Sequence, residues 1–164
     1  MSSKILVSSC LIGKRCSYDG ASRFVKAVKV LCDKCGCIDV CPEMLGGLGS
    51  PREKSEIDNA SGEDVLDGRG HVISISGQDP TPQFIRGAHL ALSLAKQNNI
   101  KIAVMKSSSP SCGRGMIHSG KFDGVLTRGN GVTTALLLRN GIKVFTDREV
   151  EENPLCVSSA LRGI

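Results

Sequence analysis

Short apolar segments alternate with helical patterns along most of this chain, and this alternation constrains the fold more than any other feature. Four apolar segments are interpreted as buried strands, and they are residues 4–9, 37–40, 101–106 and 142–147. Strands joined by helices form a parallel sheet that is covered by helices on both faces. The sequence therefore predicts an α/β fold built on a mainly parallel sheet.

Three segments between the apolar runs carry helical patterns. The apolar residues of 81–98 recur on one face, which predicts the clearest helix of the chain. A second helix is expected over 22–32 with Ser22 as its N-cap, and a third over 132–140, closed by Gly141. These helices provide the outer layers of the predicted fold.

The remaining segments are predicted to be mostly irregular. Residues 46–58 and 59–70 are glycine-rich or polar and are expected to form loops, whereas 71–77 is expected to form an edge strand and 125–127 a further short strand. We expect one domain over residues 1–164, since this length buries one continuous core but not two.

The balance of charge indicates the kind of ligand. The chain has 21 Lys and Arg against 16 Asp and Glu, a formal net charge of +5, and it has no Trp, one Tyr and four Phe. This mild positive charge suits a small anionic ligand, while so few aromatic rings provide little surface for stacking exposed bases. We therefore expect a small molecule as partner and no nucleic-acid polymer.

The eight cysteines indicate metal binding or catalysis, because a cytoplasmic location is predicted. The first ten residues lack the charged start and long apolar core of a secretory signal, and no apolar run approaches the roughly 20 residues that span a bilayer. No membrane partner is therefore expected. Cellular reductants keep cytoplasmic thiols reduced, so a disulfide framework is not expected, although some cysteines can be plain core residues.

Three cysteines follow the ends of predicted strands. Cys10 and Cys41 come directly after the first two strands, and Cys112 lies in SSSPSCGRG, a loop of serine, proline and glycine that follows the third. Loops at the carboxyl ends of parallel strands meet at one rim of the sheet. Three thiolates at that rim can hold an iron–sulfur cluster by three of its irons and leave the fourth iron open as a Lewis acid.

A second arrangement of thiols competes with this one. The pattern CxxCxCxxxCP resembles a zinc knuckle or a shortened ferredoxin run, and its thiols are Cys32, Cys35, Cys37 and Cys41. Such a cluster can bind a metal by itself, which would make the protein a zinc-binding or electron-transfer module. Its middle spacing is tighter than that of the bacterial ferredoxin pattern. A structural zinc beside a separate iron–sulfur cluster is a further arrangement that the sequence leaves open.

Five motifs cover nearly the whole chain from Lys4 to about Thr146. They are SSCLIG with YDG shortly after it, CPEMLGGLGSPR, GQDPTPQFIRGA, KSSSPSCGRG and GNGVTTALLLRNGIKVF. In this order they resemble the iron–sulfur thiouracil desulfidases. The resemblance implies a three-layer, Rossmann-like α/β domain that binds a [4Fe-4S] cluster through Cys10, Cys41 and Cys112.

The resemblance also implies an activity and its partners. The expected enzyme removes the sulfur of a thiolated pyrimidine as sulfide, without net redox change, by hydrolysis of the C–S bond. The implied substrate is thiouracil or a nucleotide such as 4-thiouridine monophosphate, and the positive net charge favours the nucleotide. The iron–sulfur assembly machinery is an expected partner. Whether sulfur leaves position 2 or position 4 of the ring stays open.

Polar residues near the three thiols are candidates for binding and catalysis. Glu43 stands two residues after Cys41 and is the candidate base that activates water, with Ser109 as a candidate proton relay. The candidates for substrate binding are Lys106, Ser107, Ser111, Gly46 and Gly47. The serines are equally suited to forming turns before Pro110, and the glycines to forming a turn of their own.

Two departures from the family pattern affect this interpretation. Ser17 stands where family members commonly carry an arginine before YDG, so Lys14 or Arg15 would have to replace it at a phosphate. The extra thiols of the CxxCxC segment are the second departure, and they keep the rival metal site open. No histidine has a second metal-ligating residue at a suitable spacing, so all three are expected to be structural or solvated. They are His71, His89 and His118.

Overall fold

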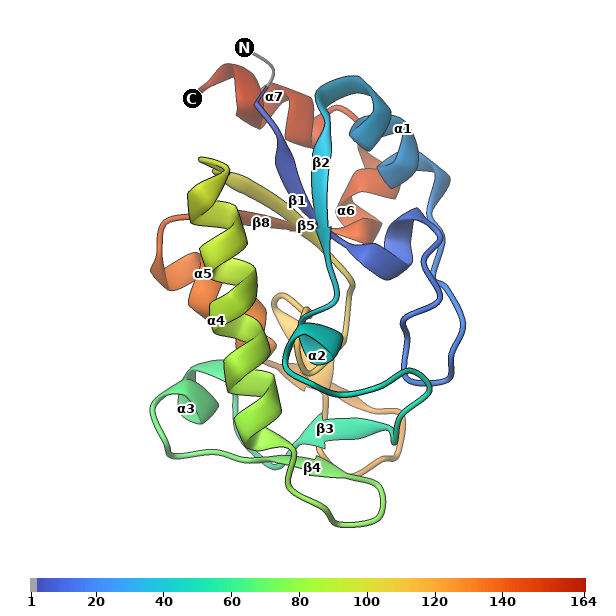
Figure 1. The fold of residues 1–164 in the computed structure, drawn as a ribbon, viewed down its shortest axis with the longest axis vertical. Helices are drawn as coiled ribbons and strands as arrows, with labels where there is room; N and C mark the ends of the chain where they lie inside the picture. Colours follow the sequence, from blue (N-terminus) through green and yellow to red (C-terminus); the bar gives the residue numbers. More distant parts are fainter. Residues whose placement is uncertain (1–2) are drawn as a thin grey trace.

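A four-stranded parallel sheet forms the centre of the protein. The computed structural model describes residues 3–164, and its main sheet has the order β2-β1-β5-β8 (Figure 1). The strands are β1 (Ile5–Ser8), β2 (Cys37–Val40), β5 (Ile102–Met105) and β8 (Lys143–Thr146), and each neighbouring pair is parallel. The four strands predicted from the apolar segments are confirmed.

Helices cover both faces of this sheet. One face packs against α4 (Thr81–Gln97) and α5 (Val132–Arg139), and the other against α1 (Lys26–Cys35), α6 (Asp147–Glu152) and α7 (Cys156–Arg162) (Figure 1). Side chains of a strand alternate between these two cores: in β1, Leu6 belongs to the first core, whereas Ile5 and Val7 belong to the second. Because both of their faces are covered, the central strands β1 and β5 are buried at every residue. The predicted three-layer α/β fold is therefore confirmed.

Smaller elements surround the carboxyl ends of the strands. They are the 3₁₀ helix η1 (Ser9–Ile12), α2 (Pro42–Leu45), α3 (Gly62–Leu66), and two antiparallel pairs, β3 (Ser55–Ile57) with β4 (Val72–Ser74) and β6 (Met116–His118) with β7 (Leu126–Arg128). The loop predicted over 46–58 was wrong at its end, where β3 forms. Glu56 of β3 is fully buried and accepts hydrogen bonds from the amides of Gly120 and Phe122, so a buried carboxylate holds this strand.

The predicted start of the helix over 22–32 was also wrong. The helix α1 begins at Lys26 with Val25 as its N-cap, and Ser22 lies outside it. The amides of Arg23 and Val25 donate to the carbonyls of Cys10 and Leu11, so the preceding segment is extended against η1 instead of being helical. Four other helices were not predicted: α2 follows Cys41, α3 lies within 59–70, α6 follows β8 directly through a capping box, and α7 lies near the end of the chain.

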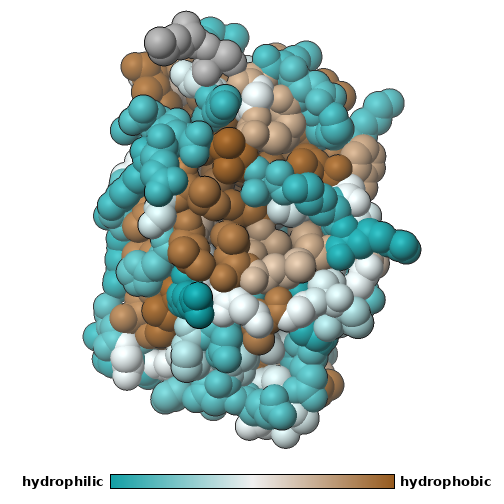
Figure 2. Space-filling view, viewed as in Figure 1, coloured by the Kyte–Doolittle hydropathy of each residue, from teal (hydrophilic) through white to brown (hydrophobic). Residues whose placement is uncertain are grey.

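The surface combines apolar and hydrophilic regions. In the view of Figure 2, apolar side chains gather in the middle of the face and hydrophilic side chains surround them. Within residues 3–164, no helix combines the length and the apolar character needed to cross a membrane.

Candidate metal centre

The carboxyl end of the main sheet carries a cavity of about 490 Å³. The strand β1 leads into η1, which contains Cys10, and β2 ends directly before Cys41, the N-cap of α2. The strand β5 leads into the loop that contains Cys112. All three thiols line this cavity, so the structure brings together the three ligands that were predicted from strand ends.

A fourth thiol, that of Cys16, lines the same cavity. Cys41 Sγ donates to the Cys16 carbonyl oxygen at 3.6 Å, and Cys10, Cys16 and Cys41 pack in the same cluster of buried side chains. Side-chain hydrogen bonding with Cys10 raises the pKa of Cys16 to about 11. The sequence did not identify this residue because it lies in the middle of a loop. A left-handed turn at Gly13 directs the loop back toward Cys10.

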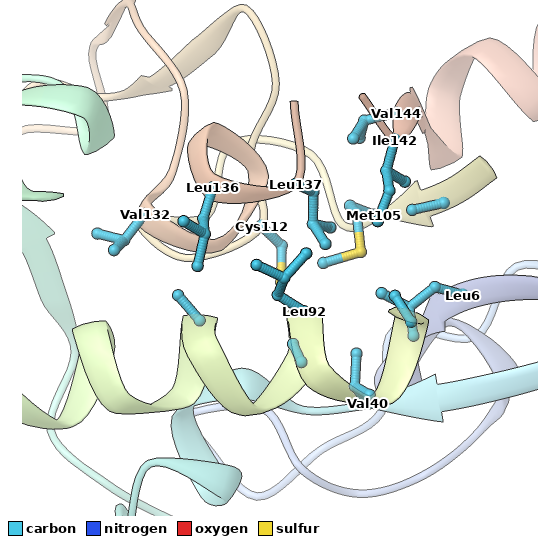
Figure 3. Close-up of a cluster of buried hydrophobic side chains, with 14 of the residues drawn as sticks. Leu6, Val40, Leu92, Met105, Cys112, Val132, Leu136, Leu137, Ile142 and Val144 are labelled. Atoms are coloured by element: carbon cyan, nitrogen blue, oxygen red, sulfur yellow. The ribbon is translucent and has the colours of Figure 1, made fainter. Parts of the chain in front are cut away.

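The thiol of Cys112 is buried between the sheet and its helices. Its side chain lies among Met105, Leu92 of α4 and Leu137 of α5 (Figure 3). Burial, followed by the charge of Glu43, raises the pKa of Cys112 to about 12. The pKa of Cys41 is also raised, by its hydrogen bond to Cys16 and then by burial. Both residues are therefore thiols at neutral pH, and a bound metal has to displace their protons.

The donor set fits an iron–sulfur cluster. Four thiols and no histidine other than His118 line the cavity, and thiolates are the usual ligands of such clusters. Among residues 3–164, no group of three or more cysteine, histidine or carboxylate side chains is placed to hold a single metal ion. Thiolates of a cluster bind different irons and therefore stand farther apart than the ligands of one ion.

The loop that carries Cys112 is docked on the start of α5. The amides of Gly131, Val132 and Thr133 donate to carbonyls of Gly113, Pro110 and Ser111, and Thr134 Oγ1 donates to the Cys112 carbonyl at 2.6 Å. A Cβ on Gly131 would lie 2.4 Å from the Ser111 backbone, so only glycine permits this contact. The position of the thiol is thus fixed by the helix.

Three predicted polar residues lie on the cavity wall beside this loop. Ser109 Oγ accepts hydrogen bonds from the amides of Ser111 and Cys112, both at 3.1 Å, which leaves its hydroxyl proton available to a ligand. Ser107 Oγ donates to the buried carboxylate of Asp147. Lys106 Nζ donates to the Ser107 carbonyl at 3.1 Å and lies 3.9 Å from Asp147.

The candidate base Glu43 is held by an arginine. Arg52 Nη2 lies 3.0 Å from Glu43 Oε2, and the two side chains are only 10% and 14% exposed. Arg52 Nη1 also donates to the carbonyls of Cys16 and Gly49. Glu43 lines the cavity with Cys41, as predicted from the two-residue spacing.

Three predicted binding residues have structural roles instead, and none of them lines the cavity. Ser111 is buried, and its hydroxyl pairs with that of Thr133. Gly46 contacts α4: a Cβ there would lie 1.9 Å from the carbonyl oxygen of Gln83. Gly47 has a φ of +102°, so it forms the left-handed turn after α2. We therefore remove these three from the candidate site.

The rival four-thiol site does not form. Cys37 begins β2, whereas Cys41 follows its end, so the strand separates them by about 13 Å at the usual rise per residue. Cys32 packs near Cys37, at the opposite end of the strand from Cys41, where burial raises its pKa. One metal ion therefore cannot bind all four thiols of the pattern CxxCxCxxxCP. The spacing alone does not reveal that its last four residues before Cys41 form a strand.

The cavity also carries cations that the sequence did not identify as part of one site. They are Arg23, Arg52, Lys54 and Arg148, in addition to Lys106. Lys14 pairs with Asp39 at 2.6 Å, and neither Lys14 nor Arg15, the expected substitutes for the missing arginine, lines the cavity. His118, expected to be structural or solvated, lines the cavity, and its Nδ1 is buried without a partner among the described residues.

Comparisons with known proteins match this geometry. The model of a family described as 2-thiouracil desulfurase matches residues 5–149. The chain belongs to this family. This confirms the resemblance found in the motifs and the prediction of an enzyme.

Two relatives cover almost the same length as the chain. The solved structure of a [4Fe-4S]-dependent thiouracil desulfidase, TudS, is 42% identical, with a TM-score of 0.81 over 95% of this chain and 98% of that one. YbbK of Bacillus subtilis (strain 168), described as uncharacterised, is 41% identical over 148 residues, which are 90% of this chain and 98% of YbbK. The desulfurase family fold therefore extends over nearly all of the chain.

Proposed function

We propose that this protein is a [4Fe-4S]-dependent desulfidase that hydrolyses the C–S bond of thiouracil or of its nucleotide. The observation that carries the proposal is the convergence of Cys10, Cys41 and Cys112 on one cavity from three separate strand ends. The family match and the cluster dependence stated for TudS support the same assignment.

The chemistry is a replacement of sulfur by the oxygen of water. The cluster, held by the three thiolates, supplies an iron with affinity for the sulfur of the thione. Glu43, fixed by Arg52, accepts a proton from the attacking water, whose oxygen bonds to the ring carbon. Sulfur leaves as sulfide and the ring regains a carbonyl, so no electron is transferred. Ser109 donates its hydroxyl proton toward the ring, and Lys106 stabilises negative charge that develops there.

The cavity charge favours a nucleotide over a free base. Five cations line the cavity against two carboxylates, Glu43 and Glu53, which gives a net charge of 5 − 2 = +3. The side chain of Arg148 is exposed and has no ion pair among residues 3–164, so we propose it as a phosphate contact. A monophosphate ester is the group that would bind such a cation.

The cluster assignment is tested by cysteine variants reconstituted under anaerobic conditions. We expect Cys10→Ala and Cys112→Ala to lose the visible absorbance of the cluster, because each removes a ligand. Cys35→Ala is the matched control and keeps the absorbance. If Cys35→Ala loses it while Cys10→Ala keeps it, the proposal is wrong and the local thiol run holds the metal.

The nucleotide is tested by the kinetics of Arg148→Gln. We expect KM for 4-thiouridine monophosphate to rise about tenfold, because a charged hydrogen bond to phosphate contributes about 1.5–3 kcal/mol. KM for 4-thiouracil should change less than twofold. Arg162→Gln in α7, which does not line the cavity, is the control. Equal changes for base and nucleotide would contradict a phosphate contact at Arg148.

A further inference from the structure

The mechanism above uses three of the four thiols at the cavity, and the fourth, Cys16, has no role in it. Its side chain is 6% exposed and faces both the core and the cavity. Its carbonyl oxygen accepts from Cys41 Sγ at 3.6 Å, and it packs in the same cluster of buried side chains as Cys10 and Cys41. A sulfur that lines the same cavity as the three proposed ligands is within reach of the same cluster.

The backbone holds Cys16 at this place. Its amide donates to the Lys14 carbonyl at 3.0 Å, and its carbonyl accepts from Arg52 Nη1 at 2.9 Å. Arg52 is also the residue that fixes Glu43. One guanidinium therefore holds both the backbone of Cys16 and the candidate base Glu43.

We propose that Cys16 is an exchangeable fourth thiolate, which binds the open iron while substrate is absent and is displaced by the sulfur of the thione. This rests on the proposed function, since it assumes that the other three cysteines hold the cluster. On displacement Cys16 keeps the electron pair of its broken bond to iron and takes a proton from cavity water. The substrate sulfur donates the pair for the new bond, so no oxidation state changes.

Such an exchange predicts a measurable competition with added thiols. The apparent affinity of an external ligand falls by the fraction of time for which its site is open. If Cys16 occupies the iron for about nine-tenths of the time, an external thiol binds about tenfold more weakly to the wild type than to a variant without Cys16. The same occupation should slow loss of the fourth iron to a chelator.

The test uses anaerobically reconstituted wild type, Cys16→Ala, Cys16→Ser and Cys156→Ala. Each is titrated with 2-mercaptoethanol while the visible absorbance of the cluster is followed, and loss of one iron to a chelator is timed by the paramagnetic signal of the three-iron cluster. We expect Cys16→Ala to bind 2-mercaptoethanol about tenfold more tightly and to lose iron several-fold faster. Cys156→Ala, outside the cavity, should match the wild type.

Cys16→Ser separates a ligand role from a packing role. Serine keeps the size and the hydrogen bonding of the side chain but is a poor iron ligand here, so we expect it to behave like the alanine variant. Equal thiol affinity and iron loss in wild type and both variants would overturn the proposal. Complete loss of the cluster in both would overturn it as well, because Cys16 would then be a permanent ligand. Failure of the proposed function is distinguished by Cys10→Ala retaining the cluster.

Discussion

At the scale of single residues, Glu43 is the side chain on which the proposed hydrolysis depends. It lies between Cys41, its neighbour two residues away, and Arg52, with which it forms an ion pair that is almost fully buried. A carboxylate held in this way has few orientations and remains directed at the cavity. General bases of this kind contribute about 10²–10⁴ to the rate.

We therefore predict that Glu43→Gln lowers kcat by about 10²-fold or more without changing iron content. The amide still accepts the hydrogen bond from Arg52 but cannot take the proton of water. Single-turnover assays with 4-thiouracil and iron analysis provide the measurement. Glu53→Gln, which changes the other carboxylate of the cavity wall, should keep kcat within about twofold; a similar kcat in both variants would remove Glu43 from the reaction.

At the scale of elements, the contact between α2 and α4 places Cys41 and Glu43. Gly46 approaches the Gln83 carbonyl, and Gly87 of α4 approaches the Pro42 carbonyl, so that two backbones touch without side chains between them. The short helix that begins after Cys41 is thus fixed against the longest helix of the protein. Any side chain at these positions has to push the two elements apart.

We expect Gly46→Ala to lower the free energy of unfolding by about 2 kcal/mol, since an added Cβ would overlap backbone atoms. Urea unfolding of the metal-free chain measures this. Gly49→Ala is the matched control, because a Cβ there has its nearest neighbour at 3.8 Å, and its free energy of unfolding should change by less than about 0.5 kcal/mol. Equal values for the two variants would contradict the close packing described here.

The elements that the sequence predicts correctly are those whose buried residues produce a clear apolar pattern. The four strands of the main sheet and the helix α4 follow directly from apolar runs and helical periodicity. The strand β3 was missed because its buried central residue is Glu56, which looks exposed in sequence. The start of α1 was missed because the extended segment before it is held by carbonyls of η1, a tertiary contact that Ser22 does not reveal.

The same division applies to the candidate site. Cys10, Cys41 and Cys112 could be predicted because strand ends in a parallel sheet share one rim. Cys16 and Arg148 could not, because each reaches the cavity from a segment whose path depends on the folded structure. Ser111 is flanked by cavity residues in sequence, but its hydroxyl pairs with that of Thr133, and Gly46 packs against the backbone of α4, so neither lines the cavity.

At the scale of the whole molecule, the proposed cluster would join three separate loops at the carboxyl ends of β1, β2 and β5. Binding to the folded state alone stabilises it by about 2.7 kcal/mol at a hundredfold excess over the dissociation constant. For a chain of this size that corresponds to a rise in Tm of about 5–10 °C.

We therefore predict a Tm at least about 5 °C higher for the reconstituted protein than for the metal-free protein, by anaerobic calorimetry. Chelation of the iron should reverse the shift. Cys10→Ala should show no shift under the same conditions. An unchanged Tm in the wild type would mean that the three loops are not joined by a bound group.

The docking of the Cys112 loop on α5 has a consequence for the order of events during synthesis. Cys10 and Cys112 are 112 − 10 = 102 residues apart, and the carbonyls around Cys112 are held by amides of residues 131–134. A nascent chain on the ribosome therefore has no complete site until residues 131–134 have emerged. On the proposed function, insertion of the cluster would follow the synthesis of this segment.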